Sequence, residues 1–176
     1  MPSLSLQWYA VSVCSRREKK CFALLSRKGI EAFLPLQKQL RKWSDRKMEV
    51  EMPLFPGYIF VRIDPSRRFE VLSTPGVVRF IRFGGEDAPV PEFQIKAIHT
   101  ALPKPDTVEI VDVIILPGEE VYISSGPFKG NYARLVRYNG KGKLQLVIEH
   151  VNKSFLVEIG RTRVQYIKAA DKAIAV

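Results

Sequence analysis

The side chains best suited to covalent or metal chemistry are few in this chain and are not spaced for it. Two cysteines, Cys14 and Cys21, lie seven residues apart, which does not match the Cys-x-x-Cys spacing of metal and redox sites. His99 falls in a helical pattern and His150 at the end of a strand pattern, with no nucleophile motif nearby. Neither a P-loop nor a G-x-G-x-x-G sequence is present. We therefore predict a protein that is not an enzyme and that needs no cofactor or metal.

Aromatic rings on one strand offer binding chemistry instead. In "PGYIFVRI", strand alternation puts Tyr58, Phe60 and Arg62 on one face and the three aliphatic residues between and after them on the other. The aliphatic set suits packing against helices, so we expect the rings on the face that the helices leave open. The alternative is that the linker or the second domain covers these rings permanently.

Positive charge is the second binding feature. The chain has a net charge of +10, which favours a polyanionic partner, and residues 1–105 hold 18 basic and 10 acidic side chains. Cations gather with one aromatic ring on a predicted hairpin: Lys38, Arg41, Lys42, Trp43, Arg46 and Lys47. Such a set suits contact with phosphates and stacking on an exposed base. The alternative is a hairpin whose charges are only solvated.

Local patterns place these residues in an α+β domain. A β-prone run at residues 8–14 is followed by Ser15 and Glu18, a capping-box pair that predicts the start of a helix ending at Gly29. Strand patterns follow on both sides of the hairpin, then a helix after Asp64-Pro65, a strand at 77–83 and a helix from Glu92. The order β-α-β-β-α-β with an added helix predicts a ferredoxin-like sandwich.

The second part of the chain has a different texture. Five short strand patterns separated by turns follow Pro117, which predicts a small five-stranded β-barrel. We expect domains at residues 5–103 and 117–168, joined by a linker at 104–116 of which part packs, and a frayed tail at 169–176. No secretory signal or membrane-length apolar segment is found, so we expect a cytoplasmic monomer with no membrane partner.

Taken in order, several motifs resemble those of the NusG family of transcription elongation factors. They are "WYAV" near the start, "FPGYIFV" at 55–61, "GVVRFIRFG" at 76–84 and "GEEVYISSGPFKG" at 118–130. The resemblance covers roughly residues 7–168 and implies an N-terminal NGN domain followed by an SH3-like KOW barrel. Within the family, "PLFPGYIFVRIDP" and "GVVRFIRFGG" are similar to specialised antitermination paralogues such as RfaH.

The resemblance also implies partners and contact residues. It implies a transcription elongation or antitermination factor that docks on the clamp helices of RNA polymerase and suppresses pausing or termination, close to upstream or non-template DNA. Polymerase contact would then fall to Trp8, Phe55, Tyr58, Phe60 and Phe83. The family's barrel recruits a ribosomal protein or Rho, and the tip "VNK", Val151, Asn152 and Lys153, takes the place of the aromatic "FGR" tip in housekeeping members. That difference disfavours Rho and leaves a ribosomal partner open.

Two other functions remain open at this point. The RNP1 signature of RNA-recognition motifs lies on the same strand of the same topology, and "PGYIFVRI" keeps part of it, with Tyr58 and Phe60 as the rings that would stack on bases. A ribosome-associated KOW protein is the third alternative. RfaH's barrel can refold as a helical hairpin, but the β-branched pattern from Val121 to Ile167 favours a constitutive barrel.

Overall fold

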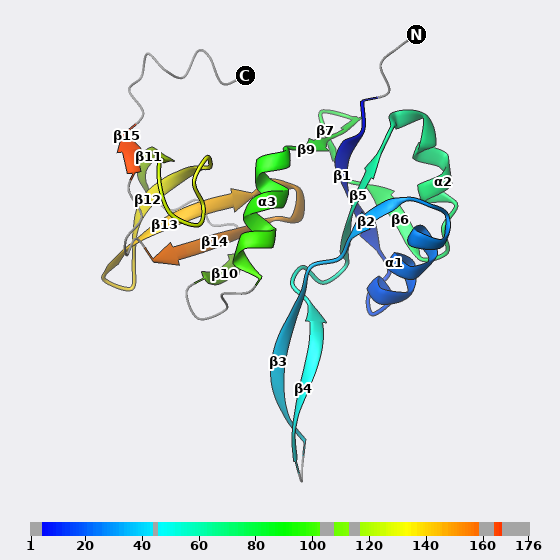
Figure 1. Ribbon diagram of the computed structural model, residues 1–176, viewed down its shortest axis with the longest axis horizontal. Coiled ribbons are helices and arrows are strands. Elements are labelled where there is room, and N and C mark those ends of the chain that lie inside the picture. The colour runs from blue at the N-terminus through cyan, green and yellow to red at the C-terminus, as the bar shows by residue number, and fades with distance from the viewer. Residues whose placement is uncertain (1–4, 44–45, 103–107, 113–116, 159–163, 167–176) are drawn as a thin grey trace. The chain divides into compact units, whose positions relative to one another are not determined.

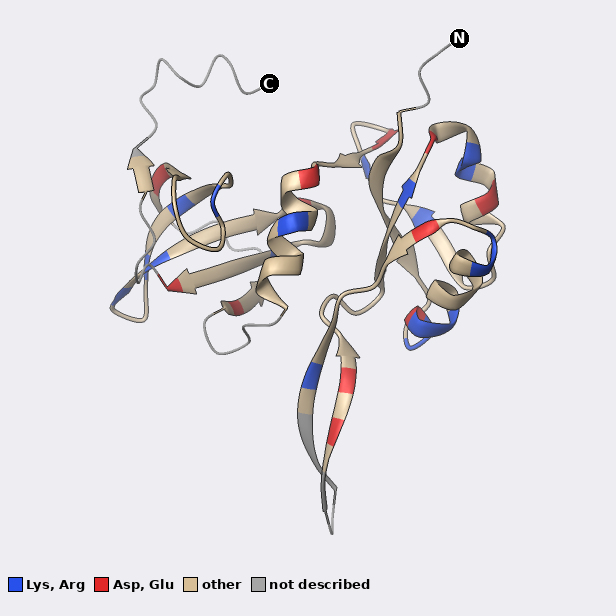
Figure 2. Ribbon diagram, viewed as in Figure 1, with Lys and Arg blue, Asp and Glu red and all other residues tan. Residues whose placement is uncertain are grey.

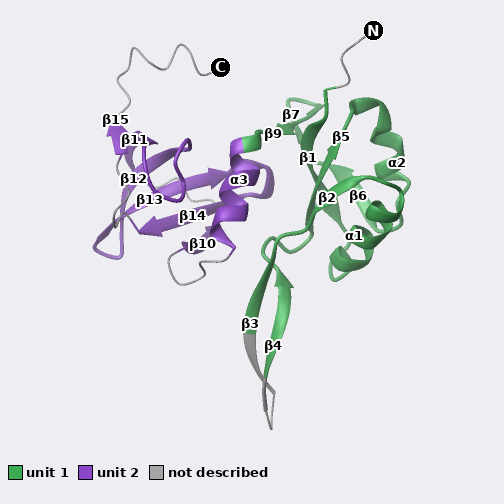
Figure 3. Ribbon diagram, in the orientation of Figure 1, with its two compact units in different colours: residues 1–92 green, residues 93–176 purple. Residues whose placement is uncertain are grey.

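The computed structural model describes residues 5–43, 46–102, 108–112, 117–158 and 164–166. The chain divides into two compact units, residues 1–92 and 93–176 (Figure 3). The expected tail at 169–176 and most of the expected linker lie outside the described residues. The domain limits given above stay predictions.

Unit 1 is built on an antiparallel sheet with the strand order β2-β5-β1-β6 (Figure 1). Its strands are β1 (Gln7–Val13), β2 (Glu31–Phe33), β5 (Tyr58–Ile63) and β6 (Val77–Phe80), and the short β9 (Pro89–Val90) also pairs with β1. Two helices, α1 (Glu18–Arg27) and α2 (Arg68–Leu72), cross over between these strands. This is the ferredoxin-like arrangement, so the predicted α+β fold class is confirmed for this unit.

The helix-covered face of the sheet carries the core of unit 1. Ile59, Val61 and Ile63 from β5 lie in one buried cluster with Cys21 and Leu25 of α1. Val71 of α2 and residues of β1 and β6 complete that cluster. The strand alternation assigned these aliphatic side chains to the helices, and the structure confirms it. Phe69 of α2 lies outside this cluster, with its side chain 79% exposed.

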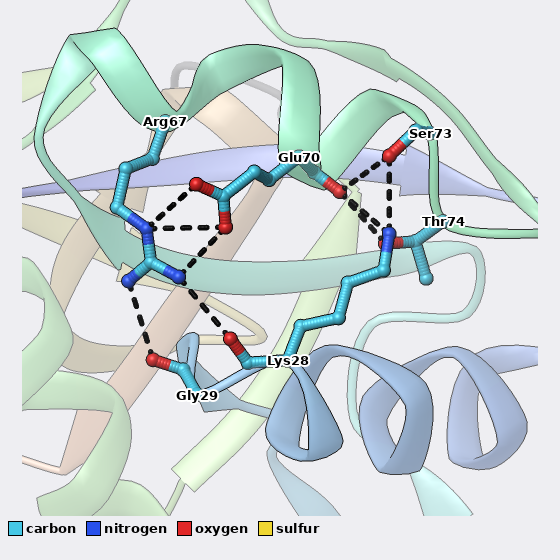
Figure 4. A network of polar contacts seen from close by, with 6 residues as sticks. All are labelled: Lys28, Gly29, Arg67, Glu70, Ser73 and Thr74. Carbon is cyan, nitrogen blue, oxygen red and sulfur yellow. Dashed lines mark hydrogen bonds and ion pairs between the residues drawn. The ribbon is translucent and has the colours of Figure 1, made fainter.

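A polar clamp joins the two helices of unit 1 (Figure 4). The Arg67 guanidinium donates to Glu70 and to the carbonyl oxygens of Lys28 and Gly29 at the end of α1, at 2.8 to 3.3 Å. Lys28 Nζ donates in return to the Glu70 carbonyl and to Ser73 Oγ at 2.9 and 3.1 Å. The hydrogen bond between Arg67 and Glu70 raises the pKa of Arg67 and lowers that of Glu70. The clamp therefore holds the C-terminus of α1 against α2.

Two short ribbons extend from unit 1. The predicted hairpin is a separate two-stranded sheet, β3 (Leu36–Trp43) and β4 (Arg46–Pro53), which projects away from the main sheet (Figure 1). A smaller ribbon pairs β7 (Arg82–Phe83) with β8 (Glu86–Asp87). The expected cap at Asp64 is confirmed: its carboxylate accepts from Ser66 N at 2.9 Å and begins the 3-10 helix η1 (Pro65–Arg67), which leads directly into α2.

Unit 2 contains an antiparallel sheet in the order β10-β14-β13-β12-β11-β15. Five of its strands were predicted: β11 (Gly118–Ile123), β12 (Tyr132–Tyr138), β13 (Lys141–Ile148), β14 (Lys153–Glu158) and β15 (Val164–Tyr166). The sixth, β10 (Val108–Asp112), comes from the apolar stretch expected to pack, and it pairs with β14. The predicted helix is α3 (Glu92–Ala101), and the 3-10 helix η2 (Glu149–Val151) joins β13 to β14. The predicted NGN-plus-KOW fold class is confirmed.

Candidate functional site

Strand register gathers aromatic side chains on the face of the first sheet opposite the helices. Phe60 of β5 is directly opposite Ala10 of β1 and Phe33 of β2. Trp8 of β1 is opposite Arg62 of β5, and directly paired residues of antiparallel strands share a face. The face therefore carries Trp8, Phe33, Tyr58 and Phe60, and Phe55 joins them from the turn before β5.

The rings contact one another in a chain of edge-on and tilted pairs. Ring centroids of Phe60 and Phe33 lie 6.1 Å apart, and those of Phe60 and Phe55 also lie 6.1 Å apart. Trp8 meets Phe33 edge-on at 6.5 Å. These separations and angles are those of favourable aromatic pairs. We call Trp8, Phe33, Phe55 and Phe60 the ring cluster.

Burial of the ring cluster differs from expectation. Phe60 is 0% exposed, Phe55 1% and Trp8 7%, whereas Phe33 and Tyr58 are half-buried. Phe60 lies on the face opposite the helices, as predicted, but the expectation that its ring is bare there is wrong. Phe55 and Trp8, which the resemblance implied as polymerase contacts, are buried as well. Part of the reason is the cluster itself, because Phe60 has Phe33 and Phe55 both against it. Strand alternation gives the face of a residue, but it does not show what else covers that face.

The turn before β5 is fixed by a buried carboxylate. Glu18, the first residue of α1, is 5% exposed, and its Oε1 accepts a hydrogen bond from Gly57 N at 2.8 Å. Gly57 has φ +84°, a conformation that favours glycine, and its carbonyl accepts from Val13 N at 2.8 Å. The predicted N-cap at Ser15 is wrong: Arg17 is the N-cap and has no side-chain cap hydrogen bond. Glu18 instead ties α1 to the turn that carries Phe55 and Tyr58.

Phe83 lies outside the ring cluster. Its side chain is 48% exposed on the small β7–β8 ribbon. Asp87 of β8 holds this ribbon through hydrogen bonds from Arg68 of α2 and from Arg82, the latter at 2.8 Å. Partial burial raises the pKa of Asp87, but the hydrogen bonds from the two arginines outweigh it, so the pKa is lowered overall. Sequence reasoning missed Asp87, whose role depends on a contact nineteen residues away along the chain.

The polar edge of the aromatic face keeps two donors that have no hydrogen-bond partner among the residues that the structure describes. Trp8 Nε1 and Arg62 Nε are both buried and unsatisfied. Arg62 does form an ion pair with Glu31 of β2, at 3.6 Å between Nη1 and Oε2. Buried donors without acceptors are uncommon in folded proteins. Strand alternation in the sequence correctly assigned Arg62 to the same face as the rings. The sequence analysis missed Phe33, whose pairing with Phe60 becomes clear only once β2 is placed beside β5.

The predicted nucleic-acid residues all lie on the β3–β4 ribbon. Lys38 is exposed and forms an ion pair with Glu49 at 3.3 Å. Figure 2 shows positive charge on β3 and negative charge on β4 in the described part of the ribbon. The backbones of the other five lie in the same two strands, where the register pairs Arg41 with Met48, Lys42 with Lys47 and Trp43 with Arg46. The ribbon therefore brings the backbones of this set together, and along the chain it lies between Phe33 and Phe55 of the ring cluster.

The three predicted partner-binding residues of the second unit differ in how far they are buried. Val151 ends η2 and is 1% exposed, so it is buried and does not offer a contact surface. Asn152 is exposed with φ +53°, and Lys153 begins β14 half-buried. Of the three predicted residues, only Asn152 is freely presented, and a partner role for this tip stays a prediction.

No metal-binding group of three or more His, Cys, Asp or Glu side chains is found among the described residues. Within the same part of the chain, no helix is long and apolar enough to cross a membrane.

A ferredoxin-like unit with a ring-bearing sheet face, joined to a second unit of short antiparallel strands, places this chain among proteins that pair an NGN domain with a KOW domain. Residues 6–99 match the family described as "Transcription termination factor nusG". The chain belongs to the NusG family.

Curated relatives agree with that assignment. The chain is 27% identical over 184 residues to the transcription termination/antitermination protein NusG of Thermus thermophilus, covering 92% of this chain and 98% of that protein. It is 30% identical over 124 residues to the protein of the same name from Lactococcus lactis, covering 69% and 66%. A structure described as "Domain interaction in Thermotoga maritima NusG" is similar with 24% identity and a TM-score of 0.49, covering 93% of this chain and 98% of that one. The similarity to RfaH stays a prediction.

Proposed function

We propose that this protein is a transcription elongation and antitermination factor that docks on RNA polymerase through the aromatic face of unit 1. The observation that carries the proposal is the ring cluster: four aromatic side chains in mutual contact on the sheet face opposite α1 and α2. The named relatives are termination/antitermination proteins, which supports transcription as the process. The clamp helices of the polymerase are the proposed docking site, and suppression of pausing or termination is the proposed outcome.

An exposed ring of the aromatic face and one of the β7–β8 ribbon make the first contacts in this proposal. Tyr58 is half-buried and Phe83 is 48% exposed, so both present ring surface in the free chain. Phe55 and Phe60 are buried, and they support the exposed rings or become accessible when the partner binds. Trp8 Nε1 and Arg62 Nε have no acceptor in the described part of the chain, and carbonyl or carboxylate oxygens on the partner would satisfy them.

Burial disfavours the RNA-recognition alternative. Base stacking requires a ring that presents its flat side to the base, and Phe60 has no exposed surface. Tyr58 alone is accessible among the two rings that the RNP1-like motif would use. We therefore place polymerase docking ahead of base stacking on this strand.

Coupling of unit 2 to a ribosomal protein through Asn152 and its neighbours completes the proposal.

A binding assay with matched aromatic substitutions tests the docking site. The variants are Tyr58→Ala and Phe83→Ala, and the control is Phe69→Ala, which removes an exposed ring from the helix layer instead. Aromatic residues at interface hot spots contribute about 2 kcal/mol or more, so we expect each face variant to weaken binding to core polymerase by roughly 30-fold. Phe69→Ala should bind as the wild type does.

Single-stranded RNA serves as the second ligand in the same assay. If Tyr58→Ala lost RNA binding while polymerase binding stayed intact, the docking proposal would be wrong and the RNA-recognition alternative correct. Equal losses for Tyr58→Ala and Phe69→Ala would show that the aromatic face has no special role. Melting curves of each variant establish that the fold is retained.

A further inference from the structure

The small β7–β8 ribbon has an anchored face and a presented face. Residues directly opposite in an antiparallel pair share a face, and the register pairs Arg82 with Asp87 and Phe83 with Glu86. Arg82 and Asp87 therefore lie on one face of the ribbon, and Phe83 and Glu86 lie on the other. The two residues between the strands are glycines with positive φ, as a two-residue hairpin turn requires.

The anchored face is tied to the core of unit 1 through one carboxylate. Asp87 accepts hydrogen bonds from Arg68 of α2 and from Arg82 of β7, and its side chain is 16% exposed. The guanidinium of Arg68 also lies over the ring of Phe80, 5.3 Å from the ring centroid. Phe80 is 2% exposed and belongs to the core cluster. Asp87 thus connects the ribbon, through Arg68, to a ring that is fixed in the core.

The backbone alone gives this ribbon little support. Each of its strands has only two residues, and two-stranded hairpins are marginally stable on their own in water. At its base, Ala88 N donates to the Ile81 carbonyl at 3.1 Å, and Ile81 N donates to the Ala10 carbonyl of β1 at 2.9 Å. These hydrogen bonds fix the base of the ribbon, and the Asp87 carboxylate adds the connection from the ribbon strands to α2.

The presented face carries an aromatic ring beside a carboxylate. Phe83 is 48% exposed, and Glu86 directly opposite is exposed and forms no ion pair with any residue that the structure describes. Directly opposite residues have Cβ atoms about 4.5–5.5 Å apart, so both side chains can meet one region of a partner. The one cation of the ribbon, Arg82, is paired with Asp87 on the other face. The presented face therefore suits an apolar spot that is bordered by a positive charge.

We propose that Asp87 positions the ring of Phe83 for docking on polymerase, and that Glu86 contacts a lysine or arginine beside the apolar spot that receives this ring. The inference deepens the proposed function and rests on it for the identity of the partner. Asp87 itself faces α2 and touches no partner, so it is a positioning residue. Ordering one side chain on binding lowers affinity by roughly 2- to 13-fold, and a ring that the ribbon already holds in place avoids that loss.

Neutralising Asp87 tests the positioning in the full-length chain. Asp87→Asn keeps the size of the side chain but removes its charge, and it should weaken binding to core polymerase by roughly 2- to 13-fold. Asp87→Glu keeps the carboxylate and should restore part of the affinity. The control is Glu70→Gln, which breaks the ion pair to Arg67, the residue next to Arg68, and leaves the ribbon untouched. Glu70→Gln should bind polymerase as the wild type does.

A double-mutant cycle separates positioning from a general loss of stability. If Asp87 acts through the ring, Asp87→Asn should cause no further loss of affinity once Phe83→Ala is present. A loss that reflects a damaged fold would instead remain in the Phe83→Ala background. Additive losses would therefore overturn the positioning role.

Fluorine NMR follows the ring without polymerase. The chain has ten phenylalanines, and after labelling with 4-fluorophenylalanine the Phe83 signal is identified by its absence in Phe83→Ala. Asp87→Asn should move this signal toward the value of the unfolded chain, whereas Glu70→Gln should not. An unchanged Phe83 signal in Asp87→Asn would show that the carboxylate does not hold the ring.

The carboxylate contact is tested by its charge and its salt dependence. Glu86→Gln should weaken binding to core polymerase by roughly 1.4- to 5-fold at low salt, the equivalent of one exposed ion pair, and Glu86→Lys should weaken it further. The difference from wild type should disappear at about 1 M salt, where charges are screened. Equal affinities of Glu86→Gln and wild type at low salt would exclude the contact. Glu70→Gln again serves as the control, since it removes one acidic charge elsewhere in unit 1.

Failure of this inference can be told apart from failure of the proposed function. If Phe83→Ala binds polymerase as the wild type does, the docking contact of the proposed function is wrong and this inference falls with it. If Phe83→Ala weakens binding while Asp87→Asn and Glu86→Gln do not, the docking contact stands and this inference alone is wrong.

Discussion

Replacing Glu18 by alanine should loosen the turn that carries Phe55 and Tyr58. The Glu18 carboxylate is 5% exposed and its Oε1 accepts the Gly57 N–H at 2.8 Å. Alanine removes this acceptor and leaves the amide of a turn residue without its partner. The rest of α1 is expected to persist, because Cys21 and Leu25 remain in the core.

The expected magnitude follows from the type of hydrogen bond. A hydrogen bond to a charged group contributes about 1.5–3 kcal/mol, so we expect Glu18→Ala to lower the free energy of unfolding by about 2 kcal/mol. For a domain of this size, 1 kcal/mol shifts the melting temperature by roughly 4–8 °C, which predicts a drop of roughly 8–16 °C. Glu18→Gln keeps a neutral acceptor and should lose about half as much.

Thermal unfolding and amide hydrogen exchange measure the effect. The exchange rate of the Gly57 amide should rise in Glu18→Ala by more than that of amides in β5, because the loss is local to the turn. Lys20→Ala is the control, since Lys20 is exposed on the same helix and should change stability by no more than about 0.5 kcal/mol. If Glu18→Ala has the same melting temperature as Lys20→Ala and the Gly57 amide stays protected from exchange, then the Glu18 carboxylate does not hold this turn.

Two further perturbations probe the supports of the site. Asp87→Asn should destabilise the β7–β8 ribbon near neutral pH. Because the folded-state pKa of Asp87 is lowered, the contribution of its carboxylate to stability is present above about pH 4 and is lost as the pH falls through the folded pKa. The melting temperatures of variant and wild type should therefore converge on acidification. A difference that is constant with pH would contradict this. Gly76→Ala should destabilise more than Gly84→Ala: both glycines have positive φ, but a Cβ at Gly76 would lie 2.6 Å from Cys21 Sγ, whereas one at Gly84 meets nothing within 4 Å. Adding Cys21→Ala should relieve part of the cost at Gly76 in a double-mutant cycle, and an additive pair would contradict the overlap.

Periodic patterns predicted most of the elements because each element satisfies them locally. Alternation in β5 assigned Ile59, Val61 and Ile63 to the helices correctly, since one face of a strand must carry the core. The cap at Asp64 was equally local, with its acceptor two residues from its donor. Residues 44–45, between the two strands of the hairpin, lie outside the described residues.

Long-range contacts explain what the sequence did not predict. Glu18 was expected to close a capping box with Ser15, but its carboxylate bonds to Gly57, thirty-nine residues away. In the short helix α2 the ring of Phe69 is exposed, and Val71 is the residue that meets the core. The residues next to Glu18 and Phe69 in the sequence do not show whether Glu18 bonds locally or at long range, or whether Phe69 is packed or exposed. Burial of the ring cluster was missed for the same reason, because it depends on side chains contributed by the turn before β5 and by β2.

Burial of the ring cluster also sets a limit on affinity in the proposed docking. If Phe55 and Phe60 contact the polymerase directly, only the fraction of molecules in which they are accessible can bind, and the apparent dissociation constant rises by the inverse of that fraction. Each 1.4 kcal/mol needed to expose the rings weakens binding tenfold. Phe83 carries no such cost, because half of its side chain is exposed already. Docking through Phe83 therefore avoids the loss of affinity that direct contact with Phe55 or Phe60 would incur.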